Sequence, residues 1–233
     1  MGFYFFDYRY FLWMLPAILL TVFAQLRVQS AYRKYAGIRC ARGYTGAQAA
    51  ERVAYSGGAR NIGLQQIGGV LSDHYDPRTN VIRLSSGVYG GTSIASVSVA
   101  AHEAGHSIQY ATGYAPIKLR ALLVPVTQFG SRLAVPLILI GLLLPVQYSF
   151  LVNLGIAFYA LAVLFQLVTL PVEFNASRRA LRALREENIL LEEELPGAKA
   201  MLSAAALTYL AACLTALLQL LRLLTIAGRR NQR

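Results

Sequence analysis

The sequence is poor in charge, and the charged residues that it has are unevenly spread. They make up 14% of the 233 positions, whereas about 25% is usual in a soluble domain. With 56% hydrophobic residues and a mean hydropathy of +0.46, the chain is neither disordered nor collagen-like. Residues 133–172 contain no charged residue. Because about 20 apolar residues cross a bilayer, this run alone is long enough for two membrane helices.

Cysteine and acidic residues are scarce as well. Cys40 and Cys213 are too few for a disulfide framework, and Cys213 lies within an apolar run. There are 11 Asp and Glu against 22 Lys and Arg. Such an excess of positive charge could indicate nucleic-acid binding. Here the basic residues are dispersed among apolar and acidic ones, which favours a role in membrane topology, so we predict no nucleic-acid partner.

Four apolar stretches predict four membrane helices. They cover residues 10–26, 133–146, 150–172 and 201–221. Asp7 and Arg9 precede the first stretch and the dense positive charge follows it. This order is the reverse of a cleavable signal peptide and predicts a retained anchor. Only the uncharged residues 145–149 join the second and third stretches, so these two should form a helical hairpin whose ends face the same side.

The distribution of Lys and Arg predicts the orientation in the membrane. Residues 27–132 contain 12 Lys or Arg and only four Asp or Glu, and positive loops stay in the cytoplasm. The segment after residue 172 belongs on the same side, because it opens with Arg178, Arg179, Arg182 and Arg185. If the last stretch also crosses, the rule is violated by Arg222, Arg229, Arg230 and Arg233. The side of the C-terminus therefore stays open.

Residues 27–132 have the pattern of a small mixed domain. Thr45 and Gln48 form a capping-box pattern before an expected helix at 46–55, which ends at two glycines. Residues 81–84 alternate after a turn and predict a strand of a small antiparallel sheet. Helical periodicity returns at residues 92–111. This last helix carries the residues with the clearest chemistry.

Residues 102–106 of that helix read His-Glu-Ala-Gly-His, the pattern H-E-x-x-H. His102 and His106 are four residues apart and share one helical face, from which both imidazoles can bind one zinc ion. Glu103 lies about 100° round the helix, where it can take a proton from an activated water and pass it to the leaving amine. Two histidines could meet by chance, but the chain has only three, and two of them flank a glutamate at this spacing.

A hydrolytic zinc site also needs a third protein ligand and an open position. Glu173 is the candidate, because it is the first charged residue after the uncharged run. It could instead be a carboxylate that marks the end of a membrane helix. His74 and Asp73 are the reserve ligands. His74 is alternatively a catalytic group that binds substrate or stabilises an oxyanion, or merely a turn residue.

The chain resembles the bacterial integral-membrane neutral zinc metallopeptidases, the YugP-like family. The resemblance rests on the H-E-x-x-H helix, on residues 173–177 (Glu-Phe-Asn-Ala-Ser) and 73–77 (Asp-His-Tyr-Asp-Pro), and on the apolar hairpin. It covers essentially the whole chain. It implies a gluzincin-type peptidase with Glu173 as third ligand beside the two histidines, and with Glu103 as base. Gluzincins commonly place an Asp where this chain has Ser177, whose hydroxyl can hydrogen-bond an imidazole but brings no charge.

We therefore predict a mainly α multi-pass membrane protein, with four membrane helices and a small α+β zincin-like cytoplasmic domain. The expected segments are an N-terminal anchor at 1–26, the catalytic domain at 27–132, a membrane hairpin at 133–172, a third-ligand helix with an acidic and basic cytoplasmic segment at 173–200, and a C-terminal membrane helix with a basic tail at 201–233. The expected location is the bacterial cell (inner) membrane, with the active site facing the cytoplasm.

The expected function is hydrolysis of peptide or protein substrates by a zinc-activated water at the surface of the lipid bilayer. Residues 81–84, just before the zinc helix, are the candidate edge strand for holding an extended peptide. Tyr75, Tyr89 and Tyr114 are candidate oxyanion donors, although a chain with 14 tyrosines offers many by chance. The alternatives are a catalytically silent scaffold that keeps zinc for structure and a basic membrane-surface or nucleic-acid adaptor, of which the dispersal of the arginines disfavours the second. Retention of Glu103 beside the ligands argues against the scaffold.

Overall fold

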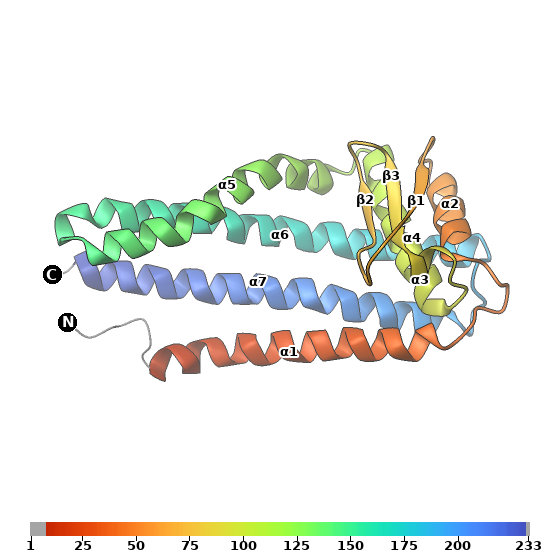
Figure 1. The fold of residues 1–233 in the computed structure, drawn as a ribbon, viewed down its shortest axis with the longest axis horizontal. Coiled ribbons are helices and arrows are strands. Elements are labelled where there is room, and N and C mark those ends of the chain that lie inside the picture. Colours follow the sequence, from red (N-terminus) through yellow and green to blue (C-terminus); the bar gives the residue numbers. More distant parts are fainter. Residues whose placement is uncertain (1–7, 232–233) are drawn as a thin grey trace. The chain divides into compact units, whose positions relative to one another are not determined.

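The computed structural model describes residues 8–231 and is mainly α-helical, as the sequence predicts (Figure 1). Its elements are α1 (Tyr8–Ala36), α2 (Gly46–Ser56), β1 (Gly63–Ile67), β2 (His74–Asp76), β3 (Val81–Ser85), α3 (Ser86–Tyr89), α4 (Ile94–Ala111), α5 (Ala115–Leu143), the 3-10 turn η2 (Val146–Tyr148), α6 (Ser149–Glu186) and α7 (Leu195–Asn231). Asp7 and Arg233, on which parts of the topology prediction rest, lie outside the described residues.

The described chain divides into two compact units. The first unit contains residues 8–23, 119–170 and 208–231, and the second contains residues 24–118 and 171–207. Helices α1, α5, α6 and α7 each contribute residues to both units. The described part of the first unit therefore consists of long helices and the short turn η2, while the sheet, α2, α3 and α4 belong to the second.

Within residues 8–231, four helices are long and apolar enough to cross a membrane, which confirms the predicted number of spans. Each of them extends beyond the apolar run that predicted it. Helix α6, for example, has 38 residues, a length of about 57 Å, whereas the hydrocarbon core of a bilayer is about 30 Å thick. The excess length forms a polar end that carries Glu173 and the residues after it.

Within the first unit, α5 and α6 form the predicted hairpin and pack closely through glycines. A Cβ added to Gly155 would lie 2.8 Å from the carbonyl oxygen of Ala134, and one added to Gly141 would lie 2.7 Å from Val152. Small residues of this kind let membrane helices approach each other. The cluster at this crossing, which α7 completes, consists of Ile138, Val152, Ile156, Leu223 and Ala227.

Arg230, near the end of α7, binds the connection between α5 and α6. Its guanidinium donates to the carbonyl oxygens of Leu142 at 3.0 Å, Leu144 at 2.6 Å and Pro145 at 3.1 Å, and to Ser149 Oγ at 3.3 Å. These carbonyls end α5 and lack helical partners, so a cation there is favourable. The C-terminal end of α7 thus lies beside the hairpin connection.

The sheet of the second unit differs from the predicted one. Its strand order is β1-β3-β2, with β1 parallel and β2 antiparallel to β3, so the sheet is mixed rather than antiparallel. The prediction that residues 81–84 form an edge strand is wrong, because β3 is central and paired on both sides. Strand β1 escaped detection because Gly63-Leu64-Gln65-Gln66-Ile67 shows no alternation of apolar and polar residues.

Helices α2 and α4 cover the core of the second unit. The predicted capping box is confirmed, since Thr45 Oγ1 accepts from Gln48 N and the Gln48 side chain accepts from Thr45 N. Helix α4 begins at Ile94 after a Ser93 N-cap, two residues later than predicted. Its buried face is rich in alanine, which allows close packing on α2 and on the polar end of α6. This face includes Val97, Ala100, Ala101, Ala104 and Ile108.

Candidate metal centre

Three side chains that the sequence singles out converge in the second unit. The possible ligand atoms of His102, His106 and Glu173 all lie within 4.8 Å of one another. Glu173 Oε2 is 3.2 Å from His102 Nε2 and 3.5 Å from His106 Nε2. The two histidines lie on one face of α4, as their spacing predicts, and the glutamate comes from α6. Both Nε2 atoms therefore face the same carboxylate oxygen.

Gly105 allows the two helices to approach closely enough for this meeting. A Cβ at this position would lie 2.6 Å from the carbonyl oxygen of Ala176 in α6. Real Cβ atoms do not come this close to a backbone oxygen, so any larger residue would force α4 and α6 apart. Gly105 directly precedes the second histidine of the motif. Its role depends on the partner helix and was not predicted from the sequence.

The centre is buried and its donor set suits zinc. Glu173 is 2% exposed and His106 is 8% exposed. Burial disfavours the charged form of His106, but its ion pair with Glu173 outweighs this effect and raises the pKa of the imidazole. Two imidazole nitrogens and one carboxylate oxygen, directed at a common point, are the ligands that catalytic zinc takes in proteins. The residues present thus fit this metal.

The second ring nitrogen of each histidine is also engaged. His102 Nδ1 is 3.1 Å from Ser177 Oγ, and His106 Nδ1 is 3.1 Å from Gln109 Oε1. Ser177 therefore occupies the position that an Asp commonly holds in gluzincins, and its hydroxyl does contact the imidazole. Such partners orient metal-binding histidines. Gln109 was not anticipated, and its position one turn after His106 on the same helix was the only signal in the sequence.

Glu103 lies next to this centre and is held by strand β2. Its Oε2 accepts a hydrogen bond of 3.0 Å from the backbone N–H of Tyr75. Burial raises the pKa of the Glu103 carboxyl, and the imidazoles of His102 and His106 oppose this rise only in part. The bond from Tyr75 occupies one carboxylate oxygen and fixes the orientation of the group.

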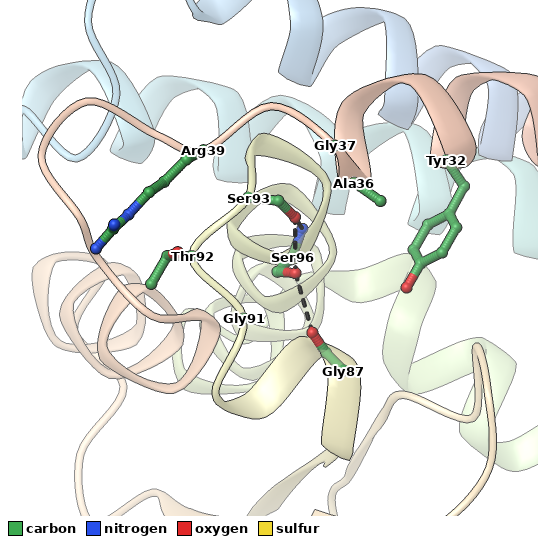
Figure 2. Close-up of a pocket in the computed structure, with 9 residues that line it drawn as sticks. All are labelled: Tyr32, Ala36, Gly37, Arg39, Gly87, Gly91, Thr92, Ser93 and Ser96. Atoms are coloured by element: carbon green, nitrogen blue, oxygen red, sulfur yellow. Dashed lines mark hydrogen bonds between the residues drawn. The ribbon is translucent and has the colours of Figure 1, made fainter.

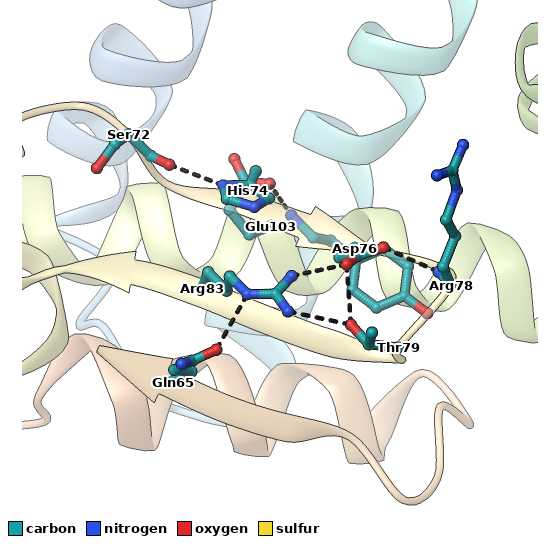
Figure 3. Close-up of polar contacts among 9 residues, drawn as sticks. Gln65, Ser72, His74, Asp76, Arg78, Thr79, Arg83 and Glu103 are labelled. Carbon is teal, nitrogen blue, oxygen red and sulfur yellow. Dashed lines mark hydrogen bonds and ion pairs between the residues drawn. The ribbon is translucent and has the colours of Figure 1, made fainter. Parts of the chain in front are cut away.

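A network of polar contacts around Asp76, the residue after Tyr75, joins the strands of the sheet (Figure 3). Arg83 in β3 donates to Asp76 Oδ2 at 2.7 Å and to Gln65 Oε1 in β1 at 3.0 Å, so it links all three strands. Thr79 Oγ1 also donates to Asp76 Oδ2, at 2.9 Å. Hydrogen bonds from Arg83 lower the pKa of Asp76 to about 2. The β2–β3 hairpin is thereby fixed beside Glu103.

The reserve ligands have other partners. His74 is exposed, and its Nδ1 lies 2.8 Å from the carbonyl oxygen of Ser72 (Figure 3). Asp73 accepts hydrogen bonds from the Ser85 backbone N–H at 2.7 Å and from the Ser85 hydroxyl at 3.1 Å. Among the described residues neither belongs to the group of ligand atoms that could hold a metal ion. A catalytic role of His74 stays a prediction.

The candidate tyrosines are engaged in structural contacts. Tyr75 Oη donates to Asn80 Oδ1 at 2.7 Å, and Tyr114 Oη donates to the carbonyl oxygen of Pro171 at 3.5 Å. Tyr89 packs against the core of the second unit. These contacts favour packing and hairpin formation over oxyanion binding for all three.

A cavity of about 230 Å³ lies elsewhere in the second unit, at the N-terminal end of α4 (Figure 2). Its lining includes Tyr32, Arg39 and the loop before α4. Two of the hydroxyls that line it are already engaged, since Ser96 Oγ lies 2.9 Å from Ser93 Oγ and donates to the Gly87 carbonyl oxygen at 3.1 Å. No residue of the candidate metal centre lines it, so this cavity is separate from the chemistry described above.

Comparison with known proteins agrees with these features. A protein family described as "Putative neutral zinc metallopeptidase" matches residues 10–228. A protein of Bacillus subtilis (strain 168) named "Putative membrane protease YugP" is 43% identical to the chain over 212 residues, which are 91% of this chain and 93% of that protein. No solved protein structure matches the chain.

Proposed function

Because the chain belongs to the family of neutral zinc metallopeptidases, whose cofactor is zinc, we propose that it is a membrane-embedded endopeptidase that hydrolyses peptide bonds. In this proposal His102, His106 and Glu173 hold the metal. The observation that carries it is the convergence of these three side chains within 4.8 Å, from helices that lie far apart in the sequence. Bound zinc supplies a Lewis acid that activates water and polarises a substrate carbonyl.

Glu103 acts as the general base and acid. Its carboxylate takes the proton from the attacking water and later donates it to the leaving amine. The raised pKa of its partly buried carboxyl suits this exchange, because a base that must release its proton again works best near the operating pH. The hydrogen bond from the Tyr75 backbone N–H keeps the carboxylate in one orientation during both transfers. A site that keeps zinc only for structure needs no such group.

His74 contributes from strand β2 by binding the substrate. The carbonyl oxygen of Ser72 can only accept, so His74 Nδ1 carries the proton of this hydrogen bond. That leaves Nε2, on an exposed side chain, to interact with a peptide. Residue His74 also neighbours Tyr75, whose amide contacts Glu103. Its position supports a role in substrate binding or oxyanion stabilisation.

The reaction takes place at the cytoplasmic face of the bacterial cell (inner) membrane, on peptide or protein substrates. In support, residues 27–132 contain 12 Lys or Arg, and positive segments stay in the cytoplasm. The proposed domain at 27–132 and the segment at 173–200 fall largely within the second unit, at residues 24–118 and 171–207. The membrane helices supply the anchor.

The proposal is tested with Glu103→Gln in the full chain, purified in detergent and loaded with zinc. The amide keeps the shape of the side chain but cannot accept the proton, so peptidase activity should fall by about 10²- to 10⁴-fold while zinc content stays the same. Glu186→Gln is the matched control, since Glu186 is exposed and pairs only with Arg182 in the surface ion pair of α6. Unchanged peptide hydrolysis in Glu103→Gln would refute the assignment of the base.

A further inference from the structure

Gln109 is a buried polar side chain that joins α4 to α6 beside the candidate metal centre. It is fully buried, at 0% exposure. Its Oε1 lies 3.1 Å from His106 Nδ1, and its Nε2 donates to the carbonyl oxygen of Val172 at 2.7 Å and to Asn175 Oδ1 at 3.0 Å. Both N–H groups of the amide and its oxygen are thus directed at three named partners.

The direction of these hydrogen bonds is fixed because some of the groups can only donate and others can only accept. A backbone carbonyl can only accept, so the part of Gln109 that faces Val172 must be the NH₂ group. Arg179 can only donate, and its Nε lies 2.8 Å from Asn175 Oδ1, so this oxygen accepts from both sides. With its NH₂ group committed to α6, Gln109 turns its oxygen towards His106.

An amide oxygen can only accept, and the proton shared with it must therefore come from His106 Nδ1. In a neutral imidazole one nitrogen carries the proton and the other carries a lone pair. His106 Nε2 then has a lone pair that faces Glu173 Oε2 at 3.5 Å. In neutral His106 these two acceptors repel each other. Either a proton on Nε2, which gives the ion pair described above, or a metal cation between the two atoms relieves this repulsion.

We infer that Gln109 is a positioning residue that locks neutral His106 in the Nδ1–H tautomer, so that Nε2 is always ready to bind the metal. The inference rests on the metal centre of the proposed function. His102 lacks such a lock, because its partner Ser177 is a hydroxyl that can either donate or accept. The two histidines of the motif thus differ. The hydrogen bonds from Arg179 through Asn175 and Gln109 fix the tautomer of His106, whereas Ser177 is compatible with either tautomer of His102.

The chain is well suited to a direct test, because it has only three histidines. Full-length protein labelled with ¹⁵N-histidine, in detergent and free of metal, gives three imidazole signals, which His74→Gln and His102→Gln assign. At a pH at which the rings are neutral, His106 should be protonated at Nδ1 and unprotonated at Nε2. If wild-type His106 carries its proton on Nε2 instead, the inference is overturned without any variant.

Gln109→Met removes the acceptor and keeps the volume. His106 should then change to the Nε2–H tautomer, which can donate to Glu173, and the affinity for zinc alone should fall by about 10- to 100-fold. Asn175→Asp keeps an acceptor for both Gln109 and Arg179, so tautomer and affinity should stay as in the wild type. Ser98→Ala is the packing control, because this buried serine bonds only within α4, to the Ile94 carbonyl oxygen.

The outcomes separate this inference from the proposed function. If Gln109→Met keeps the wild-type tautomer and its zinc affinity stays within about two-fold, Gln109 does not position His106, even though zinc binding and peptidase activity of the wild type stand. If the wild type binds no zinc, the proposed function fails, whatever the tautomer of His106. Asn175→Asp could also lose as much zinc affinity as Gln109→Met while the tautomer of His106 stays the same. That result would contradict the claim that Gln109 acts by fixing this tautomer.

Discussion

The same long helices contribute to both units of the chain, but the side chains that they bury and expose differ between the two. In the first unit apolar side chains face the exterior, and close packing depends on small residues such as Gly155. In the second unit a buried carboxylate, Glu173, and the amide Gln109 have directed partners. Helix α6 belongs to both, with an apolar part at residues 149–170 and a polar part at 171–186. A membrane helix that is too long for the bilayer thereby supplies the carboxylate that we propose as a metal ligand.

The largest difference between the two units should appear when the helices of one unit are forced apart by a larger residue at a glycine where they meet. Gly105→Ala in α4 and Gly155→Ala in α6 each place a Cβ within 3 Å of a backbone oxygen. Both should lower the free energy of unfolding by about 1–3 kcal/mol. Only Gly105→Ala should also weaken zinc binding, by about 10- to 100-fold, because it displaces α6 from α4.

Thermal melting and zinc titration of the two purified variants check this expectation. Gly90→Ala serves as the control, since nothing lies within 4 Å of a Cβ at that position. Equal loss of zinc affinity in both glycine variants would show that the two units are coupled more strongly than this comparison allows.

A smaller effect is expected from Asp76, which holds the β2–β3 hairpin through Arg83. Its pKa of about 2 lies below the ordinary value of 3.8, so its contribution to stability is fully present above about pH 4 and is lost as the pH falls through 2. Asp76→Asn should lower the melting temperature by at most about 2 °C at pH 6. The difference from wild type should shrink as the pH is lowered from 5 to 2, and a difference independent of pH would contradict this account.

The sequence indicates the parts of the molecule that depend on local spacing. The helical face shared by His102 and His106 follows from their separation of four residues, and the four membrane helices follow from apolar runs. Glu173 could be singled out only because it ends an uncharged run. The apolar pattern predicts the hairpin, but the meeting of Glu173 with the histidines depends on the packing of α6 against α4, which no local pattern encodes.

Features that depend on a partner element could not be predicted. Gly105 looks unremarkable until α6 is placed against it, and Gln109 acquires its role from Val172 and Asn175, more than 60 residues away. The parallel pairing of β1 with β3 likewise arises from tertiary contacts, since β1 lacks a strand pattern. The binding of Arg230 to the carbonyl oxygens at the end of α5 also depends on tertiary contacts and could not be predicted from the charge pattern.

The central claim is that the polar end of α6 completes a zinc site with the histidines of α4. The most direct test is the zinc content of purified full-length protein and of Glu173→Ala, measured in parallel by mass spectrometry with Glu186→Gln as control. We predict about one zinc per chain in the wild type and the control, and almost none in Glu173→Ala. A Glu173→Ala protein that is folded and keeps one zinc per chain would contradict the account.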